Sequence, residues 1–134
     1  MIPNSLDPVT ASYHRCMHGG GFVDSFYETL MASSSEVASK FRHTDFPHQK
    51  LMLRESLLVM ILFSQGQSHV REEIEQLAVR HDRDHLDIPP PMYELWINAL
   101  CRAVREHDPK FTPEVEQQWR DAMQPGIDLM KSHY

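Results

Sequence analysis

Apolar residues recur along this chain every three or four positions, almost from one end to the other. That spacing puts them on one side of an α-helix, whereas a half-buried strand would alternate apolar and polar residues. The 134 residues contain no alternating run of strand length. The pattern therefore predicts an all-α fold built from six to seven helices.

Capping signals divide the early part of this pattern. Residues 22–31 (FVDSFYETLM) carry one apolar stripe, and a run of serines follows. Ser33 with Glu36 three positions later fits a capping box, in which each residue satisfies a free backbone N–H of the first turn. This pair predicts a short helix that ends near Phe41.

Proline signals mark the later helix starts. Thr44 or Asp45 as cap, with Pro47 in the first turn, predicts a helix over residues 46–64. Ser68 is predicted to cap the helix after that. The prolines of IPPPMY and of FTPEV then predict the starts of two long closing helices.

Length and charge limit what the chain can be. With 134 residues, of which 41% are apolar, it has enough material for one domain over 1–134. A net charge of −6 argues against a nucleic-acid surface, which would need a basic face. No apolar run is long enough for a membrane span or a signal peptide. Cys16 and Cys101 form no pair motif, so we expect a cytoplasmic protein with reduced thiols.

One helical stripe ends in a histidine. Ile74, Leu77 and Ala78 share a face that His81 continues, and His85 lies one turn further on, where the chain becomes polar. A histidine at the end of a buried stripe can be a core residue, a pH switch or a metal ligand. The stripe alone leaves these three roles open.

Four segments, taken in order, resemble a globin. FYETLMASSSEVASKF is similar to the stretch from the second globin helix to the phenylalanine that packs on haem, and TDFPHQKLMLRESL to the ligand-side helix. LAVRH resembles the segment that bears the proximal histidine, and IPPPMYELWINALCRAVREHDPKFTPEVEQQWRDAMQPGIDLM the two closing helices. Across about residues 20–133, the likeness is to bacterial single-domain globins of the sensor-globin lineage. It implies a globin fold around a haem pocket, with a shortened first helix.

The resemblance implies haem b (iron protoporphyrin IX) as cofactor and His81 as its proximal iron ligand. The N–H of the second ring nitrogen in a haem-ligating imidazole commonly donates a hydrogen bond to an acceptor. Here the expected acceptor is the Leu77 carbonyl, one turn back. The stretch from His81 to Tyr93 is about two residues longer than in the commonest bacterial globins, so His85 is the competing ligand. Tyr93 is placed near the proximal imidazole.

On the ligand side, the resemblance implies that Tyr27 and Gln49 are the polar residues that face a bound gas. Gln49 precedes the predicted iron ligand by 32 positions, the separation expected in bacterial haemoglobins. Its amide could donate to the ligand or to the Tyr27 oxygen. Leu53 and Ser56 would line the pocket, and Phe41 would pack flat on the porphyrin.

Several further residues are weaker candidates. Arg80 or Arg83 could pair with haem propionates, and His43 or His48 could reach the iron as a sixth ligand. The HRCMH segment, residues 14–18, gathers donors soft enough for copper.

The expected function is reversible binding of a diatomic gas: dioxygen first, with NO and CO also able to bind. The resemblance favours a gas sensor or oxygen-binding globin over an enzyme, and a homodimer formed through the last two helices. One alternative is a haem enzyme, such as a nitric-oxide dioxygenase or a peroxidase, with electrons supplied in trans. The other is a globin-shaped interaction module without haem.

Overall fold

The computed structural model describes residues 7–134, and the first six positions of the predicted 1–134 domain lie outside the described residues. Its elements, in order, are α1 (Pro8–His18), α2 (Phe22–Ser33), α3 (Ser35–Lys40), α4 (Phe46–Ser64), the 3₁₀ turn η1 (Ser68–Val70), α5 (Arg71–His81), α6 (Pro91–His107) and α7 (Pro113–Ser132). No strand occurs within this described range. The prediction of an all-α fold with six to seven helices is confirmed, and the first helix has only 11 residues.

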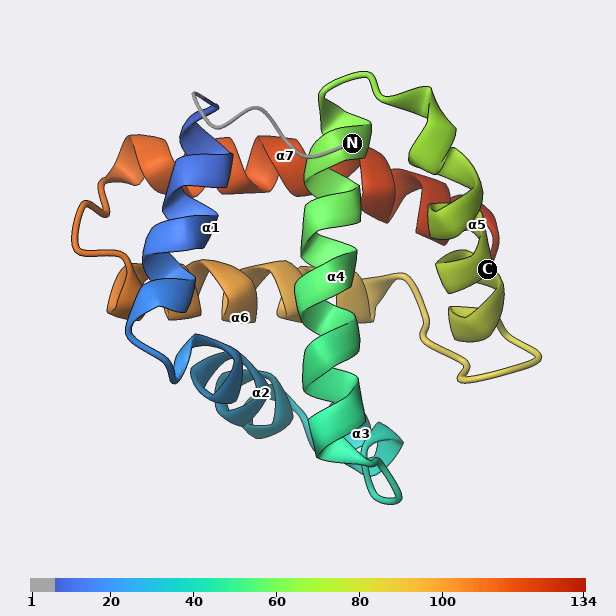
Figure 1. The fold of residues 1–134 in the computed structure, drawn as a ribbon. Coiled ribbons are helices and arrows are strands. Elements are labelled where there is room, and N and C mark those ends of the chain that lie inside the picture. The colour runs from blue at the N-terminus through green and yellow to red at the C-terminus, as the bar shows by residue number, and fades with distance from the viewer. Residues whose placement is uncertain (1–6) are drawn as a thin grey trace.

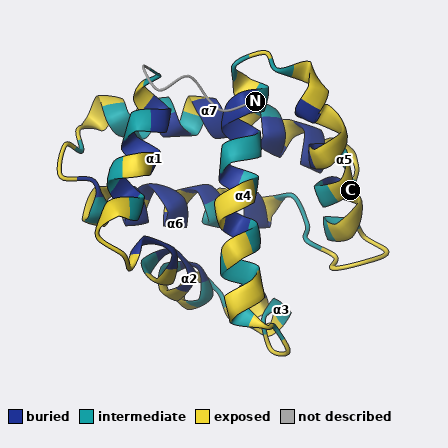
Figure 2. Ribbon diagram, in the orientation of Figure 1, coloured by how far each residue is buried: buried dark blue, intermediate teal, exposed yellow. Residues whose placement is uncertain are grey.

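The two long closing helices support the rest of the fold. In Figure 1, α1 and α4 run across α6 and α7, while α5 lies at one end of α7. α2 packs against α6, α4 and α5 pack against α7, and α1 contacts both closing helices. Figure 2 shows that the buried faces of these helices turn toward one another. Their side chains form one continuous core that includes Phe26, Leu57, Leu100 and Trp119.

α4 approaches α7 closely at Gly126. A Cβ atom built at this glycine would lie 2.9 Å from Cε of Met60 on α4. Any side chain at this position would therefore push the two helices apart or displace the methionine. α7 continues through Pro125 to Ser132, so the proline does not end the helix.

The structure confirms two of the predicted caps. The Asp45 side chain accepts a hydrogen bond from the His48 backbone at the start of α4, and α4 spans the predicted 46–64. Thr112 accepts from the Val115 backbone at the start of α7. Both prolines that follow these caps occupy the first turn, where no helical N–H is required.

Two other predicted caps were wrong. Ser33 is the last residue of α2, and Ser34 caps α3 instead because its backbone is extended, with φ −165° and ψ 137°. Its hydroxyl accepts from the Glu36 backbone. Ser68 begins the 3₁₀ turn η1, and α5 starts after it without a side-chain cap.

The outward surfaces of α6 and α7 are polar. Their exposed side chains pair along the helices, as Arg102 does with Glu106. Arg120 also donates to Asn98, which links the two helices. Within the described range, no helix is both long and apolar enough to cross a bilayer.

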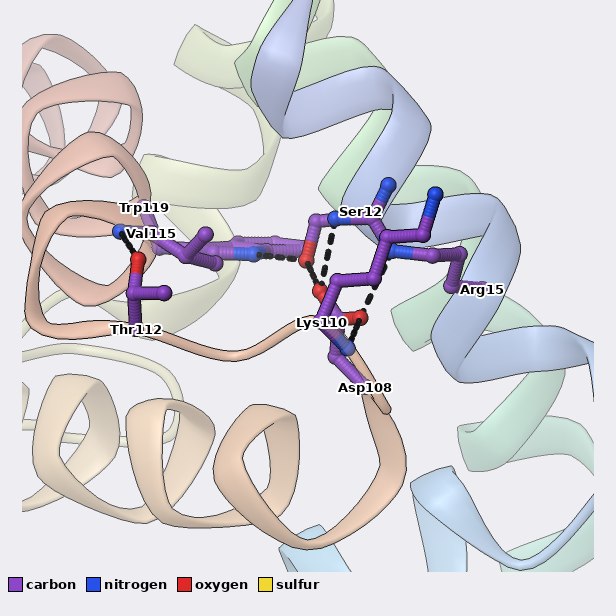
Figure 3. A network of polar contacts seen from close by, with 7 residues as sticks. All are labelled: Ser12, Arg15, Asp108, Lys110, Thr112, Val115 and Trp119. Carbon is purple, nitrogen blue, oxygen red and sulfur yellow. Dashed lines mark hydrogen bonds and ion pairs between the residues drawn. The ribbon is translucent and has the colours of Figure 1, made fainter.

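A buried carboxylate ties α1 to the turn between α6 and α7. Asp108, which follows α6, is 3% exposed and lies among donors from α1 (Figure 3). Ser12 donates to it at 2.6 Å, and the Arg15 guanidinium makes two hydrogen bonds to its two oxygens at 2.6 and 2.9 Å. The Lys110 backbone N–H adds a fourth bond, and the Trp119 indole N–H donates to the Ser12 oxygen.

These donors keep Asp108 ionised. Burial raises the pKa of its carboxyl, but the bonds from Arg15, Ser12 and the Lys110 backbone outweigh burial and lower the pKa below its usual value. A depressed pKa in the folded state stabilises the fold above the unfolded-state pKa. That contribution is lost as the pH falls through the lower, folded-state pKa.

We predict that Asp108→Ala lowers the free energy of unfolding by ~3 kcal/mol, because it leaves buried donors on Ser12 and Arg15 without an acceptor. Urea unfolding monitored by circular dichroism measures the change. Asp121→Ala is the matched control, because Asp121 is exposed and accepts a hydrogen bond from Gln117 on its own helix. This variant should lower the free energy of unfolding by no more than ~0.5 kcal/mol. Equal costs for the two variants would contradict the anchoring role of Asp108.

Candidate functional site

A large cavity opens between the two halves of the fold. Its wall is formed by Tyr27 and Leu30 of α2, Val37, Lys40 and Phe41 at α3, Gln49, Met52, Leu53, Ser56 and Met60 of α4, Leu77, Arg80 and His81 of α5, Leu86 and Ile88 of the following loop, Met92, Tyr93 and Trp96 of α6, and Ile127 and Met130 of α7. The space free of protein atoms is about 1070 Å³, including its opening to solvent.

His81 is one of the residues that line this cavity. It is the last residue of α5, and its Nδ1 lies 2.7 Å from the Leu77 carbonyl oxygen. A carbonyl can only accept, so Nδ1 carries the proton and Nε2 keeps its lone pair. Burial lowers the pKa of His81, and the nearby Arg80 cation acts in the same direction, while the bond to Leu77 partly offsets both. The predicted Leu77 hydrogen bond is confirmed, and the ring is a neutral nitrogen donor at pH 7.

His85, the competing candidate, lies outside the cavity wall. Its side chain is 54% exposed, and its Nδ1 is 2.7 Å from a carboxylate oxygen of Asp82. That hydrogen bond raises the pKa of His85 above its ordinary value. A metal must compete with the proton for the imidazole lone pair, so a raised pKa makes His85 a weaker candidate for a metal ligand.

Tyr27 and Gln49 form a hydrogen-bonded pair in the cavity wall. The Gln49 side-chain amide donates to the Tyr27 hydroxyl oxygen at 3.1 Å, and that hydroxyl donates to the Gln49 backbone carbonyl at 3.3 Å. Burial raises the pKa of Tyr27 to about 12, although the Gln49 bond opposes the shift. The phenol is therefore protonated at neutral pH and is a hydrogen-bond donor. The predicted contact between the Gln49 amide and the Tyr27 oxygen is confirmed.

Two phenylalanine rings lie beside the Tyr27 ring of this pair. Phe41 and Phe46 stack with ring centres 6.0 Å apart and planes inclined by 26°, and Tyr27 meets both of them edge-on. Phe41 follows the last residue of α3 and reaches the cavity. The short α3 helix thus brings an aromatic ring next to the Tyr27 phenol.

The remaining predicted pocket residues also gather here. Leu53, Ser56, Leu77 and Tyr93 all line the cavity, as the sequence analysis expected. Tyr93 is buried, which raises the pKa of its phenol to about 12. These four residues come from three separate helices, α4, α5 and α6, and converge on one space.

Several wall residues were missed by the sequence analysis, among them Lys40, Met52, Trp96 and Met130. The apolar residues of the closing helices follow the same periodicity as ordinary core residues, so nothing in the pattern separates wall from core. Lys40 could have been found from the sequence, because it directly precedes the predicted pocket residue Phe41.

The charges around the cavity are all positive. Lys40 and Arg80 line it, and none of its described wall residues is an Asp or Glu. Arg83, the other predicted partner for an acidic group, points elsewhere: its guanidinium carbon lies 4.8 Å from the centre of the Tyr134 ring. The cavity therefore suits an apolar ligand that carries carboxylates.

The residues present fit a haem group. Haem needs a flat apolar space, a neutral imidazole beneath the ring and cations for its two carboxylates. His81, the apolar wall, and Lys40 with Arg80 supply these three requirements. His43 and His48, the predicted sixth ligands, are exposed and do not reach the cavity wall.

The soft-donor segment near the N-terminus makes no comparable site. Cys16 of HRCMH is buried, and burial raises the pKa of its thiol to about 12, so it stays protonated. Across residues 7–134, no three His, Cys, Asp or Glu side chains lie close enough to hold a metal ion. The copper alternative has no donor cluster among these residues.

Comparison with known proteins agrees with this geometry. The family model described as Globin matches residues 24–127. A crystal structure of a Pseudomonas aeruginosa PAO1 protein, described as structurally highly homologous to a human hemoglobin, is 40% identical to this chain. The match covers 98% of both chains with a TM-score of 0.92. No curated protein matches. The family match, which spans most of the chain, shows that this protein belongs to the globin family.

Proposed function

We propose that this globin holds haem b through His81 and reversibly binds a diatomic gas: dioxygen first, with NO and CO also able to bind. The observation that carries the proposal is that His81 lines the cavity with its Nδ1 engaged by the Leu77 carbonyl, which leaves the lone pair on Nε2. When bound, ferrous haem supplies an iron able to take a diatomic ligand.

The α5 backbone orients the imidazole. The bond from Nδ1 to the Leu77 carbonyl fixes both the tautomer and the plane of the His81 ring. It also increases the basicity of Nε2, because partial negative charge from the carbonyl is transmitted through the ring. At the cavity rim, Lys40 and Arg80 are available to the two carboxylates of the cofactor.

The phenol of Tyr27 supplies the hydrogen-bond donor on the gas side. Its hydroxyl bonds to the Gln49 carbonyl over a long 3.3 Å, so the proton can turn toward a better acceptor at small cost. The Gln49 amide would keep the phenol oxygen in place by donating to it. Dioxygen is the most polarised of the three gases when bound, so this donor favours it over CO.

The predicted role is a gas sensor or oxygen-binding protein of the sensor-globin lineage, located in the cytoplasm. The resemblance leads us to expect a homodimer formed through α6 and α7. On these two helices exposed polar side chains already bond to one another within one chain, as Arg120 does with Asn98. Such an interface would be polar. Sedimentation velocity of the haem-loaded protein would measure the oligomeric state directly.

We predict that His81→Ala abolishes the five-coordinate ferrous spectrum and its shift on addition of CO, because no other imidazole borders the cavity. His85→Ala is the matched control and should leave both spectra unchanged. Circular dichroism of each variant checks that the helices are retained. Loss of the ferrous spectrum in His85→Ala alone would show that the iron ligand was assigned to the wrong histidine.

Added imidazole separates loss of the ligand from loss of the fold. In a His81→Gly variant, free imidazole should restore the ferrous spectrum, because the small molecule can occupy the space left by the side chain. No binding of haemin by well-folded wild type would reject the haem proposal altogether and leave the haem-free interaction module as the alternative.

We predict that Tyr27→Phe speeds dioxygen release about tenfold, the effect of losing one hydrogen bond worth ~1.4 kcal/mol in a pocket with little water. CO release should change much less. Stopped-flow displacement of dioxygen by CO measures the rate. Tyr13→Phe is the control, since the Tyr13 hydroxyl donates to the Arg54 carbonyl away from the cavity. An unchanged rate in Tyr27→Phe would exclude its role as a donor.

A further inference from the structure

The loop between α5 and α6 forms part of the cavity wall. Residues 82–90 connect His81 to the start of α6, and Leu86 and Ile88 from this loop line the cavity. Leu86 is 50% exposed, so it lies at the boundary between the cavity and solvent. Movement of the loop would open the cavity beside His81.

Backbone hydrogen bonds fold this loop back onto the end of α5. The amides of Leu86 and Ile88 donate to the carbonyls of Arg80 and His81, at 3.1 and 2.9 Å. Between them, Asp87 has a φ of 52°. This left-handed conformation is unfavourable for residues other than glycine, and Asp is among those that tolerate it best. The closed loop therefore has a local backbone cost that other contacts must offset.

Tyr134, which lies two positions after the end of α7, supplies such contacts. The Tyr134 hydroxyl donates to a carboxylate oxygen of Asp87, and the Arg83 guanidinium lies 4.8 Å from the centre of the Tyr134 ring. One side chain, 47 positions along the chain from Asp87, thus contacts two residues of the loop. Neither contact belongs to the cavity wall itself.

We propose that Tyr134 is a positioning residue for the cofactor pocket: its bond to Asp87 keeps the 82–90 loop closed and slows cofactor exchange past Leu86 and Ile88. The identity of the retained group rests on the proposed function. Closure of the loop does not depend on it. A hydrogen bond at the surface contributes little to global stability, so its effect falls on loop opening rather than on whether the protein folds.

The first test measures cofactor loss from the haem-loaded full chain. Haemin transfer to an excess of a haem-scavenging apoprotein should be about fivefold faster in Tyr134→Phe, which loses the hydroxyl and keeps the ring beside Arg83. Asp87→Gly removes the acceptor and also the backbone cost of the φ of 52°, so it should accelerate transfer by less than Tyr134→Phe does. The double variant should be no faster than the faster single variant, because both changes break the same bond.

The second test follows the loop directly. Hydrogen exchange at the Leu86 and Ile88 amides should be about fivefold faster in Tyr134→Phe than in wild type. Amides in the middle of α6 should exchange at the wild-type rate. Lys131→Ala, on the last turn of α7 and three positions before Tyr134, is the control and should alter neither exchange nor haemin transfer. The measurement is made on the full chain, with and without haemin.

Each outcome decides the proposal. Wild-type exchange and wild-type haemin transfer in Tyr134→Phe would overturn it, as would rate increases that multiply in the double variant. Faster amide exchange without faster haemin transfer would also overturn the proposal. It would show that Tyr134 keeps the loop closed but that the loop does not control cofactor exchange. A chain that takes up no haemin would refute the proposed function, while amide exchange would still show whether Tyr134 closes the loop.

Discussion

The hydrogen bond from the His81 ring to the Leu77 carbonyl sets the geometry of the site. It uses the carbonyl of the preceding helical turn, so the imidazole is oriented by α5 itself and needs no other side chain. With the proton on Nδ1, the lone pair of the ring is on Nε2. Burial keeps the ring neutral by lowering the pKa of His81. The Tyr27 and Gln49 pair, the aromatic rings and the two cations complete the same cavity.

α6 connects this cavity to the most polar part of the core. Its first turns contribute Met92, Tyr93 and Trp96 to the cavity wall, and Asp108 directly follows its last residue. A 17-residue helix is about 25 Å long. The buried Asp108 network thus fixes one end of α6 to α1, while its other end borders the ligand space. The buried anchor and the cavity therefore lie at opposite ends of one helix.

Much of the fold could be predicted because its helix starts have local chemical causes. Asp45 and Thr112 each precede a proline and accept a backbone hydrogen bond, so the starts of α4 and α7 follow from a few neighbouring residues. Three adjacent serines offer equivalent hydroxyls before α3, and the choice of Ser34 over Ser33 depends on where α2 ends. The Asp108 network lay beyond prediction, since Ser12 and Trp119 are 107 positions apart.

The candidate site, like the fold, has some features that the sequence predicts and others that only the structure shows. The sequence by itself determined the all-α pattern and placed His81 at the end of a buried stripe, because helical periodicity is a property of neighbouring residues. The resemblance to globins then singled out Tyr27, Gln49 and Phe41. Only the tertiary structure showed how the surroundings of the two histidines differ: His81 lines the cavity, while His85 is exposed and bonded to Asp82. It also brought Lys40 and Arg80 to one cavity and Tyr134 onto Asp87. Such contacts depend on how helices cross, which no local pattern encodes.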